Sequence, residues 1–126
     1  MREITSHQVN PANDTLRLRV IDEPGSGGAH HHYVIDGYKP ENGGVAIPTS
    51  TFIAFQNGPI NEAGVNGVTQ EVLLAIIIDR LQCFQKGPYA SRENALALTK
   101  LEEAQMWLQI RTRDRMARGV EGTHAK

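Results

Sequence analysis

The sequence predicts an α+β protein, in which a small N-terminal antiparallel β-sheet precedes a C-terminal antiparallel hairpin of two helices. The composition changes near Gly67. Before it, β-prone runs alternate with segments rich in glycine, proline and asparagine, and after it apolar residues recur with helical spacing. We therefore expect residues 1–66 to form a β region with a terminal Gly/Asn-rich loop, and residues 67–126 to form the helical hairpin.

Three strands are expected in the β region. Residues 15–22 alternate apolar and charged side chains with period two, which is typical of a half-buried strand. The glycine-rich segment 24–28 allows the chain to turn back into a second strand at residues 31–36, and residues 50–56 form the third. These runs predict a small antiparallel sheet.

Each helix of the hairpin has its own start and stop signals. Thr69 is a good N-cap for a helix that extends to about residue 84, where Gly87-Pro88 follows. Ser91 caps a second helix, which extends to about residue 117 and stops at Gly119. Two helices joined by so short a loop pack antiparallel.

Composition excludes several classes of protein. A net charge of -1 over 126 residues argues against a nucleic-acid coat protein, and the single cysteine, Cys83, excludes an intrachain disulfide framework. The longest apolar run, residues 72–78, is too short to span a bilayer, so we expect a soluble intracellular protein. This run is apolar almost all round its helix, which predicts burial on several sides, partly in a subunit interface.

An arginine cluster is the first candidate site. Spacings of four and three place Arg111, Arg115 and Arg118 on one helix face, whereas Arg113 points elsewhere. Guanidinium groups clamp phosphates and stack on bases. The same residues also fit a solvated helix end, where cations interact favourably with the helix dipole.

The turn of the hairpin is a second candidate site. Phe84, Gln85, Tyr89 and Asn94 surround the turn, where an aromatic ring and an amide suit a base. Alternatively, Phe84 is core and Asn94 merely occupies the first helical turn. Asn94 and Arg111 lie about 25 Å apart along one helix, so a small ligand that contacts both requires two subunits.

Other polar clusters carry weaker signals. Residues 57–67 form a loop dense in glycine and asparagine, including Asn57 and Asn66, which suits either close approach to a ligand or a plain connection. The His30, His31 and His32 run lacks further metal ligands at a convincing spacing and favours a solvated strand start. No catalytic set, metal site or cofactor is predicted.

Several stretches resemble the first-described family of phage Thoeris anti-defence proteins, which shares its helical hairpin with anti-CBASS sponge proteins. The resemblance covers about residues 55–124 and is carried by residues 55–60, 64–67, 84–89, 93–104, 107–108, 111–113 and 117–124. It implies a non-enzymatic protein of the infected bacterial cytoplasm that binds cyclic ADP-ribose isomers, such as glycocyclic ADP-ribose, and holds them intact. Some members also bind cyclic di- or trinucleotides.

The resemblance also implies site residues and an assembly. Phe84, Asn94, Arg111 and Arg115 match the family's ligand-contacting pattern, and the family's sites lie between subunits of a homodimer or homohexamer. Residues 67–126 are then the region of ligand binding and oligomerisation. Further candidates are Arg118, Tyr89, Gln85, Asn57 and Asn66, while Gln105 departs from the family pattern in being polar. No membrane or nucleic-acid polymer is expected as a partner.

Two other functions also fit the sequence. The histidines and arginines could belong to an enzyme that degrades the same nucleotide signals. The largely apolar first helix also fits an oligomeric adaptor for nucleic acid or protein, whose duplex binding would weaken steeply with salt. Binding of a small cyclic nucleotide without turnover separates the sponge from both.

Overall fold

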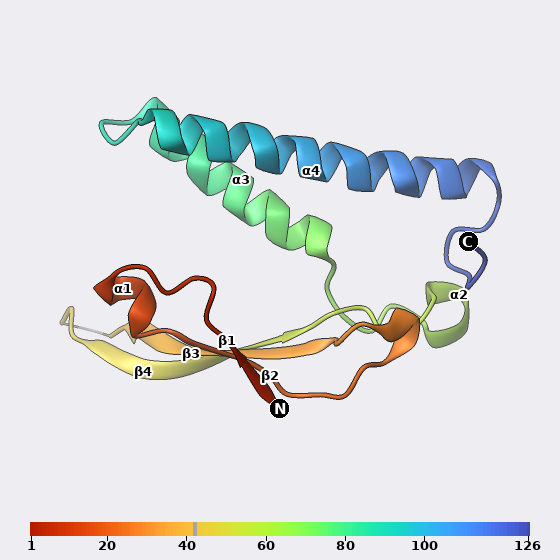
Figure 1. The fold of residues 1–126 in the computed structure, drawn as a ribbon, viewed down its shortest axis with the longest axis horizontal. Helices are drawn as coiled ribbons and strands as arrows, with labels where there is room; N and C mark the ends of the chain where they lie inside the picture. The colour runs from red at the N-terminus through yellow and green to blue at the C-terminus, as the bar shows by residue number, and fades with distance from the viewer. Residues whose placement is uncertain (42) are drawn as a thin grey trace. The chain divides into compact units, whose positions relative to one another are not determined.

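The computed structural model describes residues 1–41 and 43–126, and the chain in it forms two compact units. The β unit comprises Met1–Gly58 and Val65–Val68, and the helical unit comprises Pro59–Gly64 and Thr69–Lys126. The sheet precedes the helical hairpin in the chain, so the predicted α+β class and element order are confirmed (Figure 1).

The β unit, in its described part, contains one antiparallel sheet with the strand order β1-β2-β3-β4. Its strands are β1 (Arg2–Ile4), β2 (Arg17–Val20), β3 (His32–Pro40) and β4 (Ala46–Ala54). The three predicted strands are present, and β1 is a further strand that was not predicted. Three residues give too short a run to show an alternating pattern, and β1 exists through its pairing with β2, in which Arg2 lies opposite Val20.

Long-range pairing also extends the far edge of the sheet. The chain returns beside the end of β4, where the Val68 N–H donates to the Ala54 carbonyl at 2.9 Å. The Gln56 N–H in turn donates to the Val68 carbonyl at 2.8 Å. Gly67 therefore passes directly against the backbone of residues 54–56.

Apolar and polar side chains both connect the strands. Val20 and Val34 are the most buried apolar residues. The rings of Tyr33 and Phe55 pack edge to face, with their centroids 5.6 Å apart. Asp36 accepts hydrogen bonds from Ser50 Oγ at 2.7 Å and Arg19 Nη2 at 2.9 Å, which links β2, β3 and β4. Short helical turns, α1 (Pro11–Asp14) and η1 (Ser26–Gly28), lie in the connections.

The helical unit contains α2 (Ile60–Ala63), α3 (Gln70–Lys86) and α4 (Arg92–Ala117), and α3 and α4 form an antiparallel hairpin (Figure 1). Thr69 Oγ1 accepts from the Val72 N–H at 3.2 Å, and Ser91 Oγ accepts from the Asn94 N–H at 3.0 Å. Both predicted N-caps are confirmed. Gly119, at φ +73°, ends the last turn as predicted.

The apolar face of the hairpin is only partly covered by the chain itself. Ile78 is buried, but Ile76 remains 62% exposed. The exposed apolar side chains of the two helices include Val72, Ile77, Leu96, Met106, Trp107 and Ile110. Among the helices formed by the described residues, none is long and apolar enough to cross a membrane.

Candidate functional site

The closed end of the hairpin carries an aromatic ring, Phe84, and two amides, Gln85 and Asn94. Phe84 lies in the last turn of α3 and is half-buried, and the guanidinium carbon of Arg80 lies 5.0 Å from its ring centroid. Asn94 lies in the first turn of α4 and is also half-buried. Tyr89, at the tip of the loop, is 75% exposed.

Gln85 holds this loop closed. Its Nε2 donates to the Ser91 carbonyl, and its Oε1 accepts from the Ser91 N–H, both at 3.1 Å. The amide therefore pairs with the backbone of the residue that caps α4. Gln85 thus fixes the turn, and through it the start of the helix that carries Asn94.

Arg111 and Arg115, the two matched arginines of α4, differ sharply in their environments. Arg111 is exposed and has no ion-pair partner among residues 1–41 and 43–126. Arg115 is buried, with 7% of the residue exposed. Arg111 is therefore the arginine of this matched pair that is open to an external anion.

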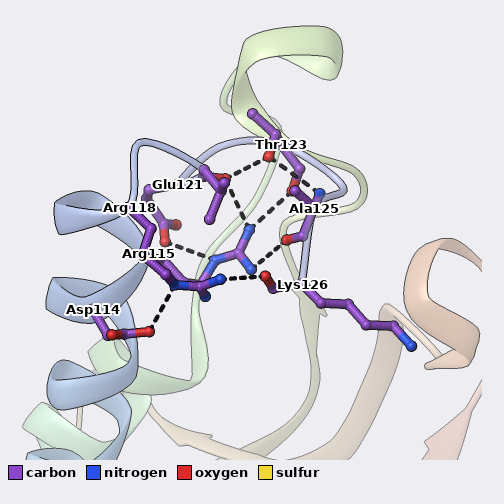
Figure 2. A network of polar contacts seen from close by, with 8 residues as sticks. Asp114, Arg115, Arg118, Glu121, Thr123, Ala125 and Lys126 are labelled. Carbon is purple, nitrogen blue, oxygen red and sulfur yellow. Dashed lines mark hydrogen bonds and ion pairs between the residues drawn. The ribbon is translucent and has the colours of Figure 1, made fainter.

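Arg115 is enclosed by the C-terminal segment, residues 119–126, as Figure 2 shows. Its Nε donates to Glu121 at 3.1 Å, and Nη1 donates to the Ala125 carbonyl at 2.6 Å. Nη2 donates to the carbonyls of Val120 at 3.0 Å and Thr123 at 3.1 Å. Four of its five N–H donors thus bind the chain's own oxygens.

Arg118 is also engaged within the chain. Its Nε donates to Asp114 Oδ2 at 3.0 Å, and Nη1 donates to the backbone carbonyl of Lys126 (Figure 2). The spacing of the sequence predicted three guanidinium groups on one helix face. In the structure, Arg111 is open, whereas Arg115 and Arg118 are engaged within the chain. The reason is that the chain turns back at Gly119 and brings the C-terminal segment onto them.

The C-terminal segment also binds α2. Gly122 is buried and has a φ of +82°, and a β-carbon at this position would lie 2.9 Å from Ile60 Cγ1. The Gly122 carbonyl accepts a hydrogen bond from the Asn61 N–H at 3.1 Å. His124 Nδ1 lies 3.0 Å from Glu62 Oε2. Sequence reasoning missed this cluster, although glycines at 119 and 122 around Glu121 were the local signal of a tight turn.

Asn57 and Asn66 secure their own loop in the β unit. The Asn66 side chain accepts from the Asn57 N–H at 2.8 Å and donates to the Asn57 carbonyl at 2.7 Å. Asn57 Oδ1 accepts from the Ser26 N–H at 3.3 Å. Both amides therefore have a structural role within the chain, and their contact with a ligand stays a prediction.

The three histidines gather around Asp22. The His31 N–H donates to Asp22 Oδ2 at 2.9 Å, His32 Nδ1 lies 3.1 Å from the same oxygen, and His30 Nδ1 lies 2.7 Å from the Asp22 carbonyl. His31 is buried, so the expectation of a solvated run was wrong at this position. Within residues 1–41 and 43–126, no group of three potential ligands is arranged for a metal ion.

Hydrogen bonds at this cluster lower the pKa of Asp22. Burial of the carboxyl acts to raise its pKa, but the His31 N–H and the His32 side chain outweigh burial and bring the pKa from 3.8 to about 2. Because the folded-state pKa is depressed, the carboxylate stabilises the fold above pH 3.8. That contribution is lost as the pH falls toward 2.

We therefore expect Asp22→Asn to weaken the pH dependence of stability between about pH 4 and 2. Urea unfolding, followed by the amide signals of β2 and β3, is measured at several pH values for both proteins. The wild type should lose stability in this window more steeply than the variant. Equal slopes would show that the Asp22 carboxylate makes no such contribution.

Taken together, these elements define an α+β protein built on a long two-helix hairpin, with an aromatic–amide end and an arginine end. The sequence profile of the Acb2/Tad1 hairpin domain matches residues 48–113, which is more than half of the chain, so the chain belongs to this family. The resemblance noted from the sequence is thereby confirmed.

A curated relative gives a second comparison. Thoeris anti-defense 1 of Bacillus phage SBSphiJ7 is 58% identical over 74 residues, which cover 59% of this chain. The same alignment covers 52% of the relative, so the chain spans about half the length of the curated relative that it matches.

Proposed function

We propose that this chain is a phage anti-defence protein that sequesters a cyclic ADP-ribose isomer, such as glycocyclic ADP-ribose, inside the infected bacterium. The ligand is held without being degraded, so the Thoeris effector is not activated. The name of the 58% identical relative supports the anti-defence role. The observation that carries the proposal is that Phe84, Asn94 and Arg111 lie within the matched hairpin, where Arg111 is exposed and has no ion-pair partner among the described residues. Arg115 follows the matched residues and is bound by the C-terminal segment, so its contact with a ligand stays a prediction.

The site requires two copies of the chain. Asn94 and Arg111 lie on one continuous helix, and 17 residues of rise separate them by about 25 Å. A compact nucleotide cannot reach both within one hairpin. We propose that the loop end of one hairpin, which carries Phe84 and Asn94, faces the arginine end of another, which carries Arg111. Phe84 then stacks on the base and Arg111 binds phosphate.

Exposed apolar side chains support this assembly. Ile76 on α3 and Trp107 on α4 are each at least 60% exposed in the single chain. A second copy, packed against these side chains, would cover them and complete the site, as expected of a homodimer or a homohexamer. The chemistry of the site supports binding, because the open guanidinium of Arg111 can hold a phosphate and the amide of Asn94 can bind a base edge.

Recovery of intact ligand tests sequestration. The protein is saturated with a cyclic ADP-ribose isomer, separated from free ligand, heated and precipitated, and the released nucleotide is identified by mass spectrometry. We expect the unchanged ligand in stoichiometric amount, and a parallel panel of cyclic di- and trinucleotides tests for wider specificity. Recovery of a linear or hydrolysed product would show an enzyme instead.

Arg111→Ala should weaken ligand binding by about ten- to a hundredfold, because a hydrogen bond to a charged group contributes about 1.5–3 kcal/mol. Arg113→Ala is the matched control, since Arg113 is also exposed on the same helix but lies outside the predicted site. Calorimetry should show a weakened Arg111 variant and an unchanged Arg113 variant. Similar affinities for both variants would remove Arg111 from the site.

A further inference from the structure

Arg80 is a residue near the candidate site that neither the family pattern nor the spacing analysis singled out. It lies four positions before Phe84 on α3, so the two side chains share one face of the helix. The guanidinium carbon lies 5.0 Å from the centroid of the Phe84 ring. This distance is within the range of about 6 Å over which a cation–π contact is effective.

The ring is the main partner of this guanidinium. Among the described residues, the side chain of Arg80 makes no hydrogen bond or ion pair, although Asp79 is adjacent in sequence. Arginine prefers to lay its planar group over an aromatic face, where it remains hydrated at its edges. The contact therefore restrains the orientation of a ring that is only half-buried.

A phenyl ring has two faces, and Arg80 covers one of them. A base that stacks on Phe84 uses the opposite face, so the guanidinium, the ring and the base would form three successive layers. The cation also adds positive charge at the end of the hairpin where Phe84, Gln85 and Asn94 are neutral. That charge suits a ligand that carries phosphates.

We propose that Arg80 is a positioning residue for ligand binding, which holds the Phe84 ring in the orientation that stacks on the nucleotide base. This inference rests on the proposed function. Arg80 acts through the ring and not through direct contact with the ligand. Its effect on affinity should therefore depend on the presence of the aromatic ring.

A double-mutant cycle tests this dependence. Calorimetry with the cyclic ADP-ribose isomer that binds the wild type is carried out on Arg80→Met, Phe84→Leu and the double variant. We expect Arg80→Met to weaken binding about two- to fivefold when the phenyl ring is present, and to have no further effect in the Phe84→Leu background. Arg80→Lys should restore only part of the affinity, because an ammonium keeps the charge but lacks the planar group that stacks on the ring. Arg92→Met, which removes an exposed arginine at the start of α4, is the control for charge alone.

The ring contact is also measured without ligand. The side-chain protons of Arg80 should show an upfield ring-current shift by NMR that disappears in Phe84→Leu. An equal loss of affinity from Arg80→Met in both backgrounds, or no loss in either, would overturn the positioning role while leaving the proposed function intact. Absence of wild-type binding to every cyclic ADP-ribose isomer would overturn both.

Discussion

Replacing Gly67 with alanine should destabilise the β unit by about 3 kcal/mol, one of the largest effects expected of any small substitution in this chain. A β-carbon at this position would lie 2.5 Å from the Ala54 carbonyl oxygen and 2.7 Å from the Gln56 nitrogen. Both neighbours are backbone atoms of the sheet edge, so they cannot move aside as a flexible side chain would. Relief of the clash requires the segment at Val68 to separate from β4.

Gly87→Ala is the matched control for this substitution. Gly87 has a φ of -112°, and its added β-carbon would meet nothing closer than 3.6 Å. Hydrogen exchange should therefore show accelerated exchange at the Gln56 and Val68 amides in the Gly67 variant and little change in the Gly87 variant. Wild-type protection of those amides in Gly67→Ala would contradict the close backbone approach.

Arg115→Ala should release the C-terminal segment from the end of α4, at a cost of about 2 kcal/mol in local stability. The substitution removes four hydrogen bonds and leaves Glu121 without its cation. The cost is limited because the freed carbonyls reach water once the segment detaches. Glu121 is also already 37% exposed at its side chain, which reduces the value of the ion pair.

The readout for this variant is amide exchange at Thr123 and Ala125, whose N–H groups are bonded within the C-terminal segment. Arg115→Lys should not restore protection, because an ammonium lacks the planar fork that reaches four acceptors. Arg113→Ala should leave exchange unchanged, since Arg113 is exposed on another side of the helix. Unaltered protection in Arg115→Ala would show that the segment is held by other contacts.

Local signals explain which parts of the fold could be predicted from the sequence. Thr69, Ser91 and Gly119 act within one helical turn, so their roles follow directly from residue type and position. β1 has no comparable signal, because three residues become a strand only through pairing with β2. The burial of His31 likewise depends on its contacts with Asp22 and Ser26, which adjacent letters in a sequence do not show.

The candidate site also combines features that the sequence predicts with features that depend on contacts between distant residues. The family pattern selects Phe84, Asn94, Arg111 and Arg115. Helix geometry places the first two at the loop end of the hairpin and the two arginines at the other end. Enclosure of Arg115 could not be predicted, because three of its partners are backbone carbonyls, which every residue type carries. The Arg80 contact is visible in spacing only after Phe84 has been recognised as a candidate ligand contact.

Mixing two variants with weakened binding tests most directly whether a ligand site is built from two copies of the chain. Phe84→Ala alters the loop end and Arg111→Ala alters the arginine end, and each variant alone should bind ligand weakly. After the two variants are unfolded and refolded together, random pairing should make about half of the dimers mixed. Each mixed dimer has one site with two intact ends and one site with both ends altered. Wild-type affinity should therefore return at about one site in four. Calorimetry that shows no restored high-affinity binding in the refolded mixture would contradict the shared site.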